Sequence, residues 1–505
     1  MTLVDNLVRG ATDYPMRAAY IYNGNETTYE ELYEHVRDTA SYLAQTGIGP
    51  GDHVALLLGN SPEFVIAYYG ILLSGAAVVP INPLYTPHEM LFILRDSGVR
   101  MAIAASVLLP AFEGVRSQLP ELEMVVLVGV DECSVPWAVP FPKMMAHTNP
   151  EWTPPVVDGG DRAVILYTSG TTGTPKGAIL THRNMASNAD SISEYLGVYT
   201  KDKFVAVLPM FHVFCMTVCL NAPIANGATI LIAPRFSPKP LIELIEEQQA
   251  TIFAGVPTMY NFMMQQSDVS ASALSSLRIC VSGGAAMPVA LLHGFEKRFN
   301  KVISEGYGLS EAAPVTAFNP VEGVRKPGSV GVDIPGVTNK VVDAEGGELA
   351  RGEVGELIVQ GPNVMEGYLN LPEETALALR NGWLYTGDMA YMDEDGYVFI
   401  VDRKKDMILV GGYNVYPREV EEVLYTHPLV MEAAVIGVPD ERFGERIQAY
   451  VVRKDESLTE DELREHCSRD LARYKVPRDI IFMEELPKNT TGKILRRSLK
   501  DQIVK

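Results

Sequence analysis

The sequence lacks the cysteine pattern of a disulfide-rich or zinc-binding protein. It has five cysteines in 505 residues, and only Cys215 and Cys219 come near a metal-ligand spacing, inside an apolar stretch. A scattered, odd-numbered set of this kind is typical of reduced thiols in a cytosolic protein. We therefore expect a cytoplasmic protein without a disulfide framework.

Targeting signals and long apolar runs are also scarce. The N-terminus carries Asp5 and Arg9 and has no continuous apolar segment, so no signal peptide is expected. The uncharged stretch Phe64–Ile81 falls slightly short of spanning length and is interrupted by glycines and a proline, so it predicts a buried helix followed by a buried strand. No transmembrane segment is expected, and peripheral contact with a membrane stays open.

Basic residues are in deficit. Lys and Arg number 42 against 63 Asp and Glu, which gives a formal net charge of -21. Such an acidic surface repels nucleic acids and anionic membranes, so no nucleic-acid partner is expected. Any polyanionic ligand must meet a locally basic site.

Helices alternate with apolar strands as far as about Thr316, and this pattern predicts parallel-rich α/β sheets. A capping box over Thr28–Glu31 predicts a helix that ends near Gln45. The proline-rich segment 131–160 is expected to be an irregular connector. Further helices are expected from Pro62 and from Pro87 to Ser97, with strands at His53–Leu58, Ala77–Ile81, Arg100–Ala105, Phe204–Leu208, Thr229–Ala233, Ile252–Gly255 and Arg278–Ser282.

The pattern changes twice towards the C-terminus. Beyond Asn319, short strands punctuated by glycine predict a β-rich subdomain, and after Asp402 a compact α+β pattern follows. We therefore expect an α/β protein with a large N-terminal domain, residues 1–402, that holds two parallel-rich sheets and the β-rich subdomain, and a small mobile α+β domain, residues 403–505. The expected C-terminal elements are helix Pro417–Tyr425, strands Val430–Gly437 and Ile447–Arg453, and helix Thr459–Leu471.

The segment Tyr167–Gly177 combines glycines, hydroxyls and one lysine directly after an apolar run. Glycines let backbone N–H groups approach an anion, and a lysine adds a mobile positive charge. The spacing differs from a Walker P-loop, because Lys176 follows Pro175 and precedes Gly177. The segment therefore predicts a phosphate loop of another kind, with candidate ligands Thr168, Ser169, Gly170, Thr171, Thr172, Gly173 and Lys176.

This segment resembles the AMP-binding signature of the adenylate-forming superfamily, which contains acyl-CoA synthetases, aryl-CoA ligases, nonribosomal peptide adenylation domains and beetle luciferases. Further landmarks of the superfamily follow in the same order, so that the resemblance extends from about Thr28 to Arg497. The chain resembles most the acyl-CoA synthetase branch and its bacterial fatty-acid–CoA ligases. The chain departs from the luciferases at Leu409, which stands where luciferases have a lysine.

The resemblance implies a site for ATP and Mg²⁺. Glu311, in Tyr307–Glu311, matches the carboxylate that holds Mg²⁺, an ion that usually keeps waters and takes one or two protein carboxylates. The residues implied in nucleotide binding are Gly283, Gly284 and Ala285 along the adenine ring, Tyr307 stacked on it within the motif that includes Gly308 and Ser310, Asp388 at the ribose hydroxyls, and Arg403 at the ribose and phosphate.

The resemblance also implies catalysis by a mobile C-terminal domain. Lys493, in Pro487–Lys493, matches the lysine that reaches the active site, where an ammonium stabilises two approaching anions. Lys405 matches the hinge about which the domain rotates between adenylation and thioester formation. The segment that enters the site in the second arrangement, where it meets CoA, contains Gly411, Gly412 and Tyr413. The candidate catalytic residues are Lys493, Glu311, Thr168 and His212.

His212 lies where the acyl pocket of the superfamily begins. Amino-acid-activating members carry an aspartate there, so an amino acid substrate is not expected, whereas acyl- and aryl-CoA ligases carry an aromatic residue or histidine as a gate. A core histidine is the alternative. No arginine other than Arg235 is a candidate to meet a second carboxylate. The apolar neighbours include several methionines, which suit flexible chains: Met210, Phe214, Met216, Val218, Val256, Met259, Tyr260, Phe262, Met263 and Met264.

These features predict an AMP-forming acid–thiol ligase. It would convert a carboxylic acid, with a medium- or long-chain fatty acid first and an aryl or cinnamate-like acid second, into acyl-AMP with release of pyrophosphate. No carrier domain follows Lys493, which favours transfer to CoA over a separate carrier protein. An inactive nucleotide-binding sensor is the alternative from another class, and a homodimer stays open.

Overall fold

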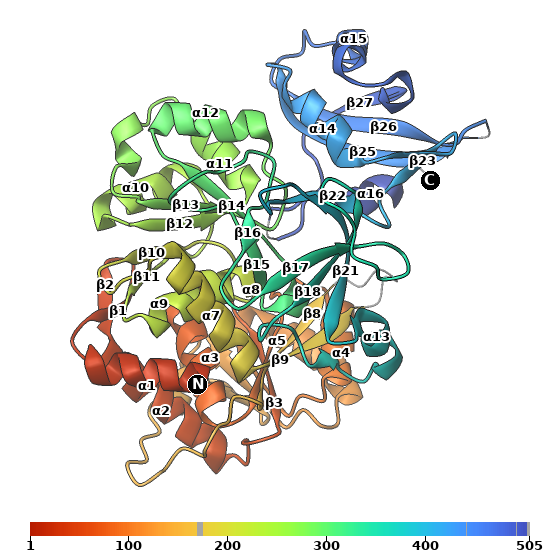
Figure 1. The fold of residues 1–505 in the computed structure, drawn as a ribbon. Coiled ribbons are helices and arrows are strands. Elements are labelled where there is room, and N and C mark those ends of the chain that lie inside the picture. Colours follow the sequence, from red (N-terminus) through yellow and green to blue (C-terminus); the bar gives the residue numbers. More distant parts are fainter. Residues whose placement is uncertain (169–174, 441, 491, 502–505) are drawn as a thin grey trace.

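The N-terminal part of the molecule contains two large sheets with a layer of helices between them (Figure 1). The computed structural model describes residues 1–168, 175–440, 442–490 and 492–501. The predicted α/β class is confirmed, including the β-rich subdomain and the smaller α+β unit at the C-terminus.

Sheet 1 is parallel through its centre and antiparallel at both edges. In spatial order its strands are β16 (Val332–Asp333), β15 (Val315–Phe318), β14 (Ile303–Gly308), β13 (Ile279–Ser282), β12 (Ile252–Gly255), β10 (Lys203–Ala206), β11 (Thr229–Ile232), β1 (Ala18–Tyr22) and β2 (Asn25–Thr28). Its outer face carries α10 (Pro238–Gln248), α11 (Pro257–Met264), η4 (Ala271–Leu274) and α12 (Val289–Phe299).

Sheet 2 follows the same plan, with parallel strands and one antiparallel edge. Its strands are β19 (Gly367–Tyr368), β9 (Lys176–Thr181), β8 (Arg162–Thr168), β4 (Ala77–Pro80), β3 (His53–Leu57), β5 (Met101–Ala105), β6 (Met124–Val128) and β7 (Ala138–Pro140). Its outer face is covered by α4 (Pro87–Asp96), η1 (Ser106–Leu108), α5 (Leu109–Val115) and η2 (Arg116–Gln118).

The helices between the sheets hold the main core together. The uncharged segment predicted to be buried forms α3 (Pro62–Leu73), and its residues from Phe64 onward are all buried. A helix that is apolar on every side needs packing partners on every side, and α3 shares one core cluster with Val78 of sheet 2 and Phe204 of sheet 1. Its neighbours in this layer are α1 (Leu3–Asp13), α2 (Tyr29–Gln45), α7 (His182–Leu196), α8 (Val213–Cys215), the π-helical η3 (Met216–Asn221) and α9 (Ala222–Ala225).

A third, antiparallel sheet forms the β-rich subdomain beside the edge of sheet 1. It contains β17 (Thr338–Val342), β18 (Gly355–Gln360), β21 (Trp383–Met392), β20 (Leu379–Arg380) and β22 (Val398–Arg403). Two short helices flank the region, namely η5 (Ser310–Ala312) and α13 (Pro372–Ala378). The connector 131–160 is less irregular than predicted, because it contributes β7 to sheet 2 and contains α6 (Phe141–Met145).

The C-terminal unit has its own sheet and helices, at the upper right of Figure 1. The sheet comprises β24 (Tyr413–Val415), β23 (Ile408–Val410), β26 (Gly444–Arg453), β25 (Val430–Asp440) and β27 (Asp479–Met483), with helices α14 (Pro417–Tyr425), α15 (Glu460–Asp470), η6 (Arg473–Lys475) and α16 (Arg496–Asp501). Across the described residues, each hydrophobic cluster lies wholly before or wholly after Lys405. Among the described helices, none is long and apolar enough to cross a bilayer.

Candidate active site

The predicted adenine loop follows β13 and leads into α12. Gly284 adopts φ +76°, a conformation that side chains rarely tolerate. A Cβ at Gly283 would lie 3.2 Å from Cζ of Phe214, so the backbone and this aromatic ring are in close contact. The loop therefore presents bare backbone at Gly283 and Gly284, followed by the small residue Ala285, beside the apolar residues that follow His212.

Tyr307, Asp388 and Arg403 meet at the junction of sheet 1 with the β-rich subdomain. The Tyr307 hydroxyl donates to Oδ2 of Asp388 at 2.5 Å, and Nε of Arg403 lies 3.4 Å from Oδ1. Burial, followed by the nearby carboxylate, raises the pKa of Tyr307 well above its usual value, so the hydroxyl keeps its proton. Asp388 is buried, and its oxygens retain acceptor capacity towards a small hydroxylated ligand.

Two of the phosphate-loop candidates, Thr168 and Lys176, lie at the ends of neighbouring strands in sheet 2. Thr168 closes β8 and pairs in register with Lys176, the first residue of β9. The candidates Ser169, Gly170, Thr171, Thr172 and Gly173 lie outside the described residues.

Lys176 is largely buried, with 12% of its side chain exposed, and forms an ion pair with Glu374 of α13. Its Nζ also lies 5.3 Å from the centroid of the Tyr368 ring. An amino group in these surroundings can meet an anion at the end of the β8–β9 hairpin.

Glu311 contacts the hydroxyl of the same tyrosine. The Tyr368 hydroxyl donates to Oε1 of Glu311 at 2.9 Å. Burial and this carboxylate raise the pKa of Tyr368, so the phenol remains a donor. Glu311 and Lys176 both contact Tyr368, so a carboxylate lies close to the lysine that is the phosphate candidate. This arrangement fits Mg²⁺, which binds through one or two carboxylates together with substrate phosphates. Gly308 and Ser310, of the same motif, lie at the end of β14 and the start of η5.

Tyr368 and Glu374 were not among the residues predicted from sequence. They join the site because β19 pairs with β9, which places Tyr368 opposite Ala178. The pairing brings together segments far apart in the chain, and a lone Gly-Tyr dipeptide carries no signal for it. The Pro372 helix start, followed by two glutamates, is the local feature that could have directed attention to Glu374.

Lys493 reaches the site on a short turn. Gly492, with φ +85°, donates its amide to the carbonyl of Asn489, and its own carbonyl accepts from Thr258 Oγ1 at 3.1 Å. Asn82 Nδ2 donates to Thr490 Oγ1 at 3.2 Å. The turn is therefore anchored to both α11 and the loop after β4.

The charge of Lys493 is perturbed by its surroundings. Burial, and then the positive charge of Arg403, lower its pKa to about 8, although Asp388 acts in the opposite direction. Burial and Lys493 together lower the pKa of His212 to about 4, so this histidine is neutral near pH 7. Its Nδ1 accepts from the Phe214 amide at 3.3 Å as the N-cap of α8, which leaves the proton on Nε2. His212 and Lys493 are thus electrostatic neighbours although they are far apart in the chain.

Polar contacts hold the C-terminal unit in this arrangement. Arg496 lies 3.0 Å from Asp402 and 2.7 Å from Glu421, which connects β22, α14 and α16. The Val289 amide at the start of α12 donates to Glu422 at 3.4 Å. These contacts and the Lys493 turn join the two parts of the molecule.

The predicted CoA segment lies elsewhere in this arrangement. Gly411 and Gly412 have φ +58° and +86° in the turn between β23 and β24. Tyr413 is 61% exposed, and its ring stacks on Tyr474 at 4.8 Å. The predicted hinge residue, Lys405, is exposed in the turn that follows β22.

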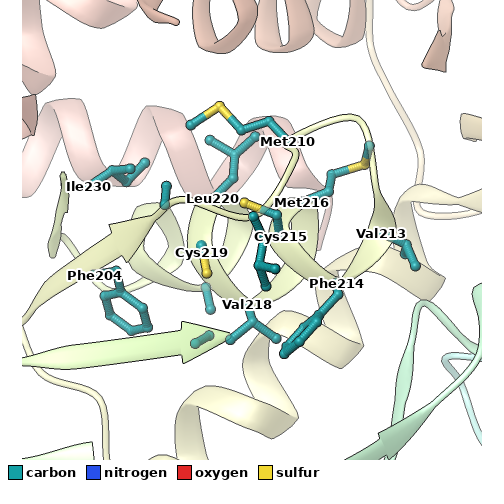
Figure 2. Close-up of a cluster of buried hydrophobic side chains, with 14 of the residues drawn as sticks. Phe204, Met210, Val213, Phe214, Cys215, Met216, Val218, Cys219, Leu220 and Ile230 are labelled. Carbon is teal, nitrogen blue, oxygen red and sulfur yellow. The ribbon is translucent and has the colours of Figure 1, made fainter. Parts of the chain in front are cut away.

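The apolar residues beside His212 form part of the main core. Figure 2 shows Phe214, Cys215 and Met216 on the helical segment that passes beneath the loop carrying Met210. Met259 and Met263 of α11 belong to the same cluster. Arg235 is exposed rather than directed into this core, as expected for an uncharged region.

Two family models match the chain, described as "AMP-binding enzyme" over residues 7–369 and "AMP-binding enzyme C-terminal domain" over residues 419–493. A long-chain-fatty-acid–CoA ligase of Bacillus subtilis (strain 168) is 39% identical, over 99% of this chain and 94% of the relative.

Solved structures agree with this similarity. ATP-bound MatB from Rhodopseudomonas palustris superposes with a TM-score of 0.92 at 31% identity, over 99% of both chains. The anthranilate CoA ligase AuaEII, in complex with anthranoyl-AMP, superposes with a TM-score of 0.93 at 31% identity, over 99% of this chain and 97% of the other. With the family models spanning most of its length and a near-complete match to curated relatives, the chain belongs to the AMP-binding enzyme family.

Proposed function

We propose that this chain activates a medium- or long-chain fatty acid as acyl-AMP, with release of pyrophosphate, and then transfers the acyl group to CoA. Acyl-CoA ligase activity through an acyl-adenylate follows from the family and from similarity to CoA ligases over nearly the whole chain. The observation that carries the choice of acid is the 39% identity to a long-chain-fatty-acid–CoA ligase over 99% of this chain, and the uncharged, methionine-rich core beside His212 agrees with it.

In the first half-reaction, an oxygen of the substrate carboxylate attacks the α-phosphorus of ATP, and the bond to the bridging oxygen of pyrophosphate breaks. Asp388 accepts hydrogen bonds from the ribose hydroxyls, with Tyr307 and Arg403 holding its position. Lys493 places an ammonium between the two anions as they approach each other, and neutral His212 borders the acyl side. These groups stabilise charge without a covalent enzyme intermediate.

The phosphates of ATP are bound by Lys176 and Thr168, and through Mg²⁺ by Glu311. Mg²⁺, when bound, supplies charge neutralisation between phosphate oxygens. Glu311 is held for that ion by the Tyr368 hydroxyl, and Lys176 meets the β- and γ-phosphates from the edge of β9.

The second half-reaction requires another arrangement of the C-terminal unit. The sulfur of CoA attacks the acyl carbonyl, AMP leaves, and the thiol proton passes to solvent. Rotation about Lys405 would withdraw Lys493 and bring the glycine turn with Tyr413 to the site, where Gly411 and Gly412 leave room for the pantetheine arm.

Similarity to AuaEII favours an aryl acid as the second candidate, since that relative is a ligase of anthranilate. Both candidates are tested by mass spectrometry of products after incubation of the protein with ATP, Mg²⁺, CoA and a mixed panel of fatty, aryl and amino acids. We expect acyl-CoA from fatty acids. Aryl-CoA as the main product would select the second candidate, acyl-AMP without thioester would indicate a carrier protein as acceptor, and no product would favour a sensor.

The protonation of Lys493 predicts an alkaline limit to adenylation. Its pKa of about 8 means that the ammonium required for catalysis is present below that pH and is lost above it. We expect kcat/KM for ATP in ATP–pyrophosphate exchange to fall as pH rises through about 8, since this parameter reports the free enzyme.

The matched control for this pH profile is Lys493→Arg, whose guanidinium stays charged throughout the range. Any residual activity of this variant should show its alkaline decline at a higher pH than in the wild type. An alkaline limb at the same pH in both proteins would assign the titration to another group.

A further inference from the structure

Lys176 already has an anionic partner in this structure. Its Nζ is paired with Oε2 of Glu374, a contact in which 12% of the lysine side chain and 37% of the glutamate side chain are exposed. The ammonium also lies over the face of the Tyr368 ring, with Nζ 5.3 Å from the ring centroid. The lysine assigned to phosphate is therefore neutralised by the protein itself.

The fold holds Glu374 in place for this contact. Strand β19 pairs with β9, the strand that begins at Lys176, and Leu369 donates its amide to the Gly177 carbonyl at 2.8 Å. Thr375 Oγ1 accepts from the Tyr368 amide at 2.8 Å, which ties the first turn of α13 to β19. The ion pair thus joins two anchored backbones rather than two mobile surface side chains.

A carboxylate and a phosphate bind a lysine ammonium in the same way. Each takes one or more of its three N–H donors, and each repels the other when both are charged. When Lys176 turns to the triphosphate, Glu374 loses its partner and gains an anionic neighbour. Nucleotide binding must therefore work against this contact.

We propose that Glu374 is an internal competitor of the nucleotide's phosphates: it occupies Lys176 in the resting enzyme, is displaced by ATP, and takes the lysine back as pyrophosphate leaves. This inference rests on the proposed function, in which Lys176 meets the β- and γ-phosphates. It makes Glu374 a positioning residue that lowers the affinity for ATP and pyrophosphate and favours release of the latter.

The test is the affinity of full-length Glu374→Gln for ATP and for inorganic pyrophosphate, by isothermal titration calorimetry. Removing one member of a partly exposed ion pair should tighten both Kd values by about fivefold. The gain should shrink at 0.5 M NaCl, since salt screens exposed charges over roughly 5 Å or less at that strength. In steady state, KM for ATP should fall while kcat stays equal or declines.

Glu373→Gln is the matched control, because it changes net charge equally one residue away, and it should leave both Kd values near those of the wild type. Glu374→Asp, with a shorter reach but the same charge, should fall between wild type and Glu374→Gln. Unchanged or weaker binding by Glu374→Gln, with an unchanged melting temperature, would overturn the competitor role. A wild-type protein that bound no ATP would overturn the proposed function and this inference with it.

Discussion

Replacing Lys493 with Ala should lower kcat for acyl-adenylate formation by about 10³-fold, the loss seen when one preorganised donor is removed from a charged transition state. The ammonium lies on a turn anchored to Thr258 and has the electrostatic field of Asp388 and Arg403 around it. ATP–pyrophosphate exchange measures the loss. Calorimetry should show an ATP Kd within about threefold of wild type, because the ammonium acts mainly in the transition state.

Lys500→Ala, in the basic helix α16 that follows the Lys493 turn, is the control for general loss of charge, and it should retain wild-type adenylation. If Lys493→Ala still formed adenylate at the normal rate, the assignment of this lysine to the chemistry would be wrong. If it failed to bind ATP, the lysine would contribute to the ground state instead.

Replacing Lys405 with Pro should separate the two half-reactions, lowering thioester formation by about 10²-fold, as expected when a reacting group is held out of position. Proline fixes φ and excludes the helical region for the residue before it, so residues 404 and 405 would no longer absorb a rotation. Among the described backbone hydrogen bonds, none uses the Lys405 amide as donor, so the change removes no backbone hydrogen bond. Lys405 is the third residue of the turn closed by the Asp406 amide and the Arg403 carbonyl, a position that disfavours proline, so the melting temperature of the variant is measured alongside its kinetics. Single-turnover acyl-AMP formation should stay near that of the wild type.

Lys405→Ala controls for the lost charge and should support both half-reactions. The measurement is made in two rapid-quench experiments, one for acyl-AMP from ATP and acid, and one for acyl-CoA from preformed acyl-AMP. Equal losses in both for Lys405→Pro would remove the reason for placing the hinge at this residue.

Local signals in the sequence were sufficient to find part of the helices and strands, among them α2, α3, α4 and α14, whereas no bounds were predicted for α1, α7, α10 and α11. The capping box predicted at Thr28 is present, with its side chain accepting from the Glu31 amide, and α2 ends at Gln45. Helix Pro417–Tyr425 was predicted with both ends correct. Prolines hid β7 and α6 in the connector, because a proline can begin a helix or end a strand as well as break one. The order of strands, set by contacts between distant segments, had no local signal.

In the candidate site, too, local motifs identified some residues, whereas others are placed only by the pairing of distant segments. Asp388 and Arg403 were predicted from motifs, and the structure places them in contact. Glu374 and Tyr368 were missed, because their positions depend on the pairing of β19 with β9. The pKa of about 8 for Lys493 could not be predicted either, since it arises from burial against residues that are distant in the sequence.

The polar junction between the two parts of the molecule has a thermal consequence. Across the described residues, no hydrophobic cluster contains side chains from both sides of Lys405, and the contacts between the two sides include Arg496 with Asp402 and Glu422 with the Val289 amide. Heat-capacity changes follow the apolar surface that becomes hydrated. A rotation that exchanges one set of polar contacts for another should therefore have a heat-capacity change near zero, and its enthalpy should stay almost constant as the temperature changes.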